Sequence, residues 1–318
     1  MKKRIILVGG DPNSINSEII YKSWIKISNQ VKKRIVIISN YKLLKDQFKK
    51  LNLKIKLSKI KDISEIHYDN SLQVLNVELN YKNPFNVSKK SASKFVLKSL
   101  NLAHKLSLNK KIAGMINCPI DKNLLNRKIG VTEYLATKCA IKDGSEVMII
   151  KNKKLMISPI TTHLDLKLIP AKINKNLIIK KIKIINNWFK KTYKKKPKII
   201  ITGLNPHNAE FRSNSEENKI IIPAIKTLRK KNINIEGPVA ADTIFINDYK
   251  NYDVIVGIYH DQILAPFKAL FKFDAINLTL GLKYIRVSPD HGVAKNLINK
   301  KKSNPLSLIN CIEYIHKS

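Results

Sequence analysis

The sequence predicts an α/β protein whose strands are largely parallel. Short apolar runs of strand length alternate with segments of roughly 10 to 17 residues in which apolar residues have helical spacing. The predicted strands end in polar turns, and no internal repeat or long Gly/Ser linker interrupts the alternation. With 318 residues the chain is long enough for one large domain or two smaller ones.

The N-terminal part of the chain begins with a well-bounded strand. Its apolar run at residues 5–8 is followed by Gly-Gly-Asp-Pro, which ends the strand. Asn13 or Ser14 is the candidate N-cap of the helix that follows. A later segment has the 3.6-residue period of an amphipathic helix. In order, the expected elements are strands at 4–10, 34–39 and 111–119, and helices at 17–30 and 91–106.

The second half of the chain repeats this pattern, with apolar runs that lead into GLNPH and GIYHD. Two further segments have helical spacing, and the acidic pair Glu216-Glu217 lies in the first turn of one of them, where it complements the helix dipole. The expected elements are a strand followed by a polar turn within 197–207 and again within 252–261, and helices at 177–193 and 216–231.

The composition is that of a globular protein, with 44% hydrophobic and 26% charged residues. Three widely spaced cysteines, Cys118, Cys139 and Cys311, predict a reducing compartment without a disulfide framework. No apolar run approaches the roughly 20 residues of a membrane helix, and the opening run stops at Gly9-Gly10, too early for a signal peptide. We therefore expect a cytoplasmic protein with no membrane partner.

The net charge of +37 would suit a nucleic-acid-binding protein. The lysines, however, are spread along the whole chain among many Ile and Asn residues, with one dense run at residues 190–198. No RNA-binding aromatic signature and no paired Cys/His finger accompanies them. A general drift in composition explains the charge better. A basic RNA-binding protein on an enzyme-like fold stays open as an alternative, and it predicts binding that weakens steeply with salt and needs no metal.

Three histidines lie in polar segments that follow apolar runs: His163 in TTHLDL, His207 in GLNPHNAE and His260 in IYHDQ. Ligands bind at strand ends in open α/β sheets, and neutral imidazole is the commonest metal ligand. The spacing matches no local metal motif, so satisfied structural histidines remain the alternative. Asp261 is positioned to orient His260. The other histidines considered, His67, His104 and His316, are expected to be structural or exposed.

A second polar set lies downstream and consists of Lys268, Asn277 and Arg286, followed by SPDHG at residues 288–292. Lysine supplies a point charge, asparagine an amide and arginine a fork of donors, which together suit a phosphate. Arginine is scarce in this lysine-rich chain, so Arg286 is the most informative member. A structural role for a single arginine at a strand end is the alternative.

Several motifs occur in the order found in one enzyme family. They are GGDP, NCPIDK (117–122), GVTEYLA (130–136), TTHL, GLNPH, ADTIF (241–245), YHDQ and NLTLGLKYIRVSPDHG (277–292). In this respect the chain resembles the 4-hydroxythreonine-4-phosphate dehydrogenases of vitamin B6 (pyridoxal phosphate) biosynthesis. The resemblance runs from about residue 4 to about residue 300, nearly the whole chain.

The resemblance implies a fold and a set of site residues. The implied fold is two α/β domains around a cleft, similar to isocitrate and isopropylmalate dehydrogenases. The first domain consists of residues 1–130 plus 288–318. The second consists of residues 131–287 and carries the metal ligands and dimer contacts. It further implies a homodimer with the active site at the subunit interface. The implied metal ligands are His163, His207 and His260, the implied substrate contacts are Thr132, Lys268, Asn277 and Arg286, and the implied cofactor contacts are His291 and Gly292 in an HGxA loop.

The implied reaction is oxidation of 4-phosphohydroxy-L-threonine by NAD or NADP, followed by decarboxylation. A divalent metal ion, Zn, Mg, Co or Mn, would polarise the oxygen that is oxidised. Lys268 and Arg286 would neutralise the phosphate and orient the substrate. Asp242 in ADTIF is a candidate to orient a metal ligand or relay a proton.

The chain departs from the family pattern at three places. Val131 replaces the histidine of the family's GHTE motif, residues 13–18 replace a Gly-rich turn, and NAEFRSN after His207 lacks its usual glycines. The metal triad and the lysine-asparagine-arginine set are intact. Another phosphorylated hydroxy acid, such as a four-carbon phospho-sugar acid, therefore stays open as the substrate.

Overall fold

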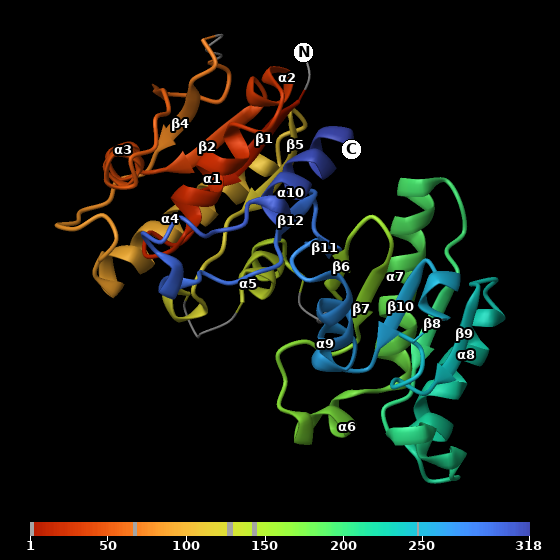
Figure 1. Cartoon of the computed structure of the whole chain (residues 1–318). Helices are drawn as coiled ribbons and strands as arrows, with labels where there is room; N and C mark the ends of the chain where they lie inside the picture. The colour runs from red at the N-terminus through yellow and green to blue at the C-terminus, as the bar shows by residue number, and fades with distance from the viewer. Residues whose placement is uncertain (1–2, 66–68, 126–129, 142–144, 247) are drawn as a thin grey trace. The chain divides into compact units, whose positions relative to one another are not determined.

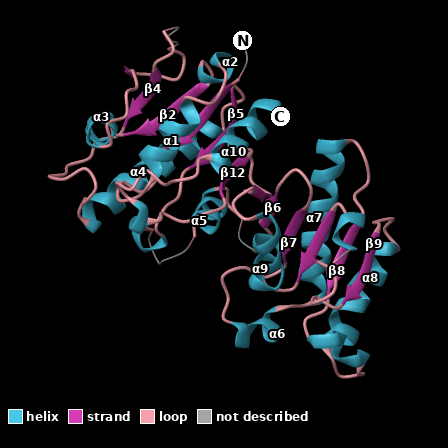
Figure 2. Cartoon of the chain, in the orientation of Figure 1, coloured by secondary structure: helices cyan, strands magenta, loops and turns pink. Residues whose placement is uncertain are grey.

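In the computed structural model, two compact units make up the chain: unit 1 is Met1–Ala140 with Leu282–Ser318, and unit 2 is Ile141–Gly281 (Figure 1). The structure describes residues 3–65, 69–125, 130–141, 145–246 and 248–318. His67 lies outside these ranges. Within each unit, strands pair side by side and helices pack on them, as the colouring by secondary structure shows (Figure 2).

The sheet of unit 1 is parallel throughout its described pairings. Its strands lie in the order β3 (Leu57–Ile60), β4 (Leu72–Asn76), β2 (Ile35–Ser39), β1 (Arg4–Val8), β5 (Ile112–Asn117) and β12 (Arg286–Pro289). The central strands β1 and β2 are buried along their whole length, as their continuous runs of Ile, Val and Leu predict for a sheet covered on both faces.

Helices cover both faces of this sheet. Because side chains alternate along a strand, Ile6 and Val8 join one core cluster together with Phe95 and Leu100 of α4 (Lys89–Ser107), while Ile5 and Leu7 face the other way. Helix α10 (Leu306–Lys317) packs on β12 and β5 and against α1 (Asn16–Trp24). Among the described residues, the unit also has the helices α2 (Asn29–Lys32), α3 (Tyr41–Lys50) and α5 (Val131–Lys138) and the short turns η1 (Lys122–Leu124) and η7 (Lys295–Leu297).

The single helix predicted at residues 17–30 is wrong, because the structure has two helices there. Helix α1 ends at Trp24, and α2 begins at Asn29. Between them Ser28 takes an extended backbone conformation, and its carbonyl accepts the amides of Val31 and Lys32. Serine favours this position at the start of a helix, so the buried Ile27 and Val31 belong to separate turns.

The sheet of unit 2 mixes parallel and antiparallel pairs. Its order is β11 (Ile276–Leu280), β6 (Val147–Lys151), β7 (Met156–Pro159), β10 (Val254–Gly257), β8 (Ile199–Thr202) and β9 (Ile235–Val239). The pairs β11–β6 and β6–β7 are antiparallel, and the other described pairs are parallel. The largely parallel pairing that the sequence predicts therefore holds except at these two antiparallel pairs.

The helices of unit 2 pack on this sheet. Helix α9 (His260–Phe271) lies against β7 and β10, where its Ile263, Leu264 and Phe267 complete an apolar cluster with Ile157 and Ile255. Helix α7 (Lys175–Tyr193) packs against α8 (Ile222–Arg229) and β6. The shorter elements are α6 (Ile169–Lys172), η3 (Leu166–Leu168), η4 (Pro206–Phe211), η5 (Glu217–Ile221) and η6 (Asp248–Asn251).

The domain boundaries predicted at residues 130/131 and 287/288 differ from those of the units. Residues 131–140 and 282–287 belong to unit 1. The reason lies in α5, where Tyr134 and Leu135 are part of the core of unit 1 and the Tyr134 hydroxyl donates to Asn101 Oδ1 at 2.8 Å. Thr132 and Arg286 are consequently residues of unit 1. Within the described ranges, no helix has the length and apolarity needed to cross a membrane.

Candidate active site

Arg286 is held inside unit 1 by two of its own donors. It is the first residue of β12, which pairs with β5, and only 3% of its surface is exposed. Its Nε donates to Asn117 Oδ1 at 2.7 Å, and its Nη1 donates to Thr132 Oγ1 at 3.1 Å. Thr132 lies in the first turn of α5. The structure therefore brings together two of the four predicted substrate contacts.

The charge of Arg286 is desolvated. Burial lowers the pKa of its guanidinium to about 10, while the nearby Glu133 acts in the opposite direction. At neutral pH the group stays protonated, because this pKa is still well above 7. A buried cation beside a hydroxyl and the first turn of a helix attracts an anion, since the positive end of the helix dipole acts in the same sense as the cation.

Val131 is the first residue of α5, next to Thr132, and it packs partly against the core of unit 1. No side chain caps this helix at Gly130. At this position the chain thus offers a hydrophobic contact and no side-chain hydrogen-bond donor.

Lys268 and Asn277, the other two predicted substrate contacts, belong to unit 2. Lys268 is an exposed residue near the C-terminal end of α9, and Asn277 is a half-buried residue of β11. The buried Oδ1 of Asn277 accepts no hydrogen bond from the residues that the structure describes. The predicted phosphate contacts are therefore divided equally between the two units.

His163 and His260 lie side by side in unit 2. Their ring centroids are 5.8 Å apart, and Nδ1 of His260 is 2.6 Å from Oδ1 of Asp261. A hydrogen bond at Nδ1 leaves Nε2 as the nitrogen available to a metal, the arrangement that carboxylate partners impose on ligating histidines. The strand expected within residues 252–261 is β10, which ends at Gly257, and His260 is not in the expected polar turn but is the first residue of α9.

His207 lies on an exposed turn of the same unit. Its side chain is 74% exposed, and its Nδ1 is 3.9 Å from Glu210 Oε1. Among the residues that the structure describes, no three His, Cys, Asp or Glu side chains converge on one point that would hold a metal. The donor chemistry of the three histidines suits a borderline metal ion. Two of these three histidines, His163 and His260, already lie next to each other in this chain.

The turn that carries His207 has a left-handed backbone without any glycine. The φ angles of residues 207–211 lie between 45° and 55°, a region that non-glycine residues rarely occupy. The sequence of this turn, His-Asn-Ala-Glu-Phe, lacks the glycines usual in the family. The chain therefore adopts a glycine-like backbone here with residues that have a Cβ, and each of them is strained to some degree.

Replacing Glu210 by glycine is expected to stabilise the protein by about 1 kcal/mol, because the left-handed conformation of a residue with Cβ costs about 1–2 kcal/mol. The Glu210 side chain is 69% exposed, so little packing is lost. Urea denaturation followed by circular dichroism measures the change. The matched control is Glu210→Ala, which removes the same carboxylate but keeps Cβ. An equal gain in both variants would show that the stabilisation comes from the carboxylate instead.

The loop with His291 and Gly292 follows β12 in unit 1. Asp290 N donates to Ser307 Oγ at 3.0 Å, and Lys295 at the end of the loop contacts Asp121 Oδ2 at 2.8 Å. A Cβ placed on Gly292 would have no atom within 4 Å. The loop is thus fixed at both ends, and the space beside Gly292 is open, which suits contact with part of a dinucleotide.

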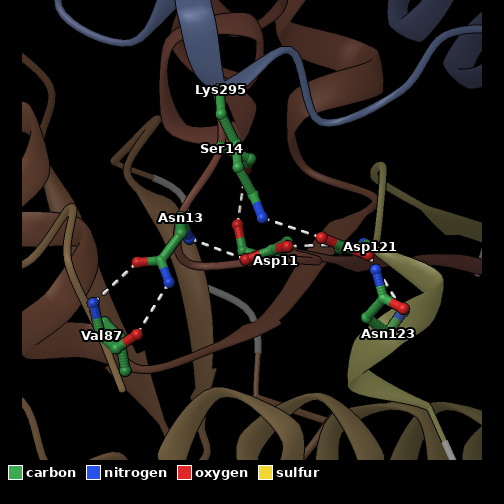
Figure 3. A network of polar contacts seen from close by, with 7 residues as sticks. All are labelled: Asp11, Asn13, Ser14, Val87, Asp121, Asn123 and Lys295. Carbon is green, nitrogen blue, oxygen red and sulfur yellow. Dashed lines mark hydrogen bonds and ion pairs between the residues drawn. The ribbon is translucent and has the colours of Figure 1, made fainter. Parts of the chain in front are cut away.

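Next to this loop, polar side chains organise the turn after β1 (Figure 3). Asn13 pairs with both backbone groups of Val87 at 2.8 Å. The buried Asp11 accepts the amide of Asn13 at 2.8 Å, and Ser14 Oγ donates to the carbonyl of Asp11. Burial raises the pKa of Asp11. Side-chain hydrogen bonds therefore hold the turn that lacks the glycines of the family.

Asp242, the predicted orienting or relay residue, is exposed in the turn after β9, and its role remains a prediction. Sequence reasoning gave no role to Asn117, although it lies in the NCPIDK motif at the end of a predicted strand. A polar residue that ends a buried strand was the signal available for it.

The two α/β units give the chain a fold that resembles that of isocitrate dehydrogenase. Its structure superposes on isocitrate dehydrogenase from Methylococcus capsulatus with a TM-score of 0.52 at 11% identity, covering 100% of this chain and 85% of the other, which shows a shared fold alone. The predicted fold class is confirmed.

Closer relatives identify the family. The family model described as pyridoxal phosphate biosynthetic protein PdxA matches residues 30–315. The chain is 37% identical to 4-hydroxythreonine-4-phosphate dehydrogenase from Sulfurihydrogenibium sp. (strain YO3AOP1), covering 98% of this chain and 96% of the relative. A crystal structure of the same enzyme from Klebsiella pneumoniae matches with a TM-score of 0.84 at 26% identity, covering 99% of each chain. The chain belongs to the PdxA family, as the sequence predicted.

Proposed function

We propose that this chain is a 4-hydroxythreonine-4-phosphate dehydrogenase of pyridoxal phosphate biosynthesis. It would oxidise 4-phosphohydroxy-L-threonine to 2-amino-3-oxo-4-phosphooxybutanoate, which loses carbon dioxide to give 3-amino-2-oxopropyl phosphate. The observation that carries the proposal is the contact of Arg286 with Thr132, because it joins residues from two separate motifs into one cationic site.

The residues of this chain would act on the substrate in distinct ways. Arg286 and Thr132 would bind the phosphate, with the cation neutralising it and the hydroxyl fixing one oxygen. Lys268 and Asn277 would supply a second charge and an amide. Binding the remote phosphate in this way would orient the carbon that is oxidised. Val131 would contact the substrate through its methyl groups and give no hydrogen bond.

The metal would be held by His163, His207 and His260, with Asp261 orienting His260 through its ring nitrogen. When bound, NAD or NADP accepts the hydride, and a Zn, Mg, Co or Mn ion polarises the hydroxyl oxygen. His291 and Gly292 would contact the nucleotide. We further propose a homodimer with the active site at the subunit interface, which light scattering of the purified protein would test.

The test is NADH formation, followed by absorbance, from 4-phosphohydroxy-L-threonine and NAD with and without a chelator. We expect turnover that a chelator abolishes and that added divalent metal restores. Repeating the assay with NADP ranks the two cofactors. A folded, metal-loaded protein without turnover would contradict the named substrate, and turnover of another phosphorylated hydroxy acid would then assign the same chemistry to that compound.

A further inference from the structure

Backbone pairing and a side-chain hydrogen bond hold Asn117 in the orientation in which it contacts Arg286. It is the last residue of β5 and is only 3% exposed. Its backbone is in register with Val8 of β1, and the next amide, that of Cys118, donates to the Val8 carbonyl at 3.0 Å. Its side-chain Nδ2 donates to the Cys118 carbonyl at 3.3 Å, which leaves Oδ1 directed at Arg286 Nε. The orientation of this amide is therefore set by the sheet.

The contact with Nε has a specific consequence for the guanidinium. The five N–H donors of arginine lie in one rigid plane, so a short hydrogen bond at Nε limits rotation of that plane. Nη1 meets Thr132 in the same plane. These two contacts therefore restrict the orientation of the fork, and both of these partners, Asn117 and Thr132, are uncharged.

The absence of charge on Asn117 matters as much as its position. An aspartate at the same place would accept the same hydrogen bond, but it would neutralise a cation that is almost completely buried. An amide orients the guanidinium without adding a negative charge beside it. Glu133 lies close enough to raise the pKa of Arg286, so a second carboxylate beside this cation would leave little attraction for an anion.

We propose that Asn117 is a positioning residue of the phosphate site, which orients Arg286 and preserves its charge for the phosphate of the substrate. The inference rests on the proposed function, which supplies that phosphate. It assigns to the NCPIDK segment a role in substrate affinity rather than in the chemical step.

Two variants test the two parts of this inference. Asn117→Ala removes the oriented acceptor, and we expect it to raise KM for 4-phosphohydroxy-L-threonine about tenfold or more, with kcat and KM for NAD changed much less. Asn117→Asp keeps an acceptor for Arg286 Nε but loses the Nδ2 donor to the Cys118 carbonyl, so a thermal melt checks that the variant is folded. Because it neutralises Arg286, we expect a rise in KM at least as large. A purely structural residue would instead tolerate aspartate and show no selective effect on KM.

The matched control is Asn40→Ala in the same unit. Asn40 is a buried asparagine whose amide donates to the Val77 carbonyl and whose oxygen accepts the amide of Leu43 at the start of α3, remote in sequence from any site residue. We expect it to lower stability and leave KM unchanged. An unchanged KM in Asn117→Ala would overturn the positioning role, and an unchanged KM in Asn117→Asp would overturn the requirement for an uncharged residue.

A binding measurement separates this inference from the proposed function. Calorimetric titration with inorganic phosphate needs no turnover, and we expect both Asn117 variants to bind it at least about tenfold more weakly than the wild-type protein. Loss of phosphate affinity in a protein that does not oxidise the named substrate would refute the function and keep the inference. Turnover by the wild type with phosphate affinity unchanged in both variants would refute the inference alone.

Discussion

Replacing Arg286 by lysine is expected to lower kcat/KM for the phosphorylated substrate by roughly 30-fold to several thousand-fold, the range that follows from losing about 2–5 kcal/mol at a buried charged contact. Lysine keeps the positive charge but concentrates it on one nitrogen that has no planar fork. It cannot reach Asn117, Thr132 and a phosphate in the directions that the guanidinium serves, and its strongly hydrated ammonium is harder to bury.

Steady-state kinetics of Arg286→Lys, combined with a thermal melt, measures this effect. The matched control is Arg34→Lys, because Arg34 is also a buried arginine of unit 1, and its Nε donates to the Lys3 carbonyl at 2.8 Å. We expect the control to lose stability and to keep its kcat/KM. Wild-type kinetics in Arg286→Lys would show that a charge alone is sufficient and that the fork has no role.

Removing the imidazole of His260 or His163 is expected to abolish metal binding and activity together. Loss of a partner that only orients a ligand already costs about 10–100-fold in metal affinity or activity. We therefore expect loss of a ligand itself to cost more than about 100-fold, and Asp261→Asn to fall within the smaller range. His207→Ala should resemble His260→Ala if the exposed turn closes on the metal.

Elemental analysis of the purified variants reports metal content independently of turnover. His316→Ala serves as the control, since His316 contacts Arg34 in unit 1, and its metal content should match that of the wild type. Full metal content in His207→Ala would remove His207 from the ligand set and leave the pair His163 and His260 in need of another third ligand.

The parts of this fold that the sequence predicts are those that depend on local patterns. The apolar runs at residues 5–8 and 254–257 became buried strands, and the period at 91–106 became α4. Local pattern could not reveal that β11 and β6 pair antiparallel, because strand direction depends on the path of the whole chain. The break at Ser28 depends on tertiary packing in the same way.

In the candidate site, too, local sequence patterns could be predicted and contacts between distant residues could not. Motif order was sufficient to predict the family. The contact of Arg286 with Thr132 could not be predicted from spacing, because the two residues are separated by 154 positions. Asn117 has its role only because β5 and β12 are neighbours. The left-handed turn at 207–211 has no glycine, and Asn208 alone, a residue that tolerates this conformation, does not predict a run of five such residues.

Unit 1 is built from both ends of the chain, and this determines the order in which its parts become available during synthesis. At roughly 5–20 residues per second, all of residues 141–281 emerge from the ribosome, over about ten seconds or more, before β12 and α10 can join the strands made first. Unit 2 is contiguous and can fold in that interval. The exposed edge of β5 and the residues beneath α10 must wait, so this half of the nascent protein is the one that chaperones have most reason to protect.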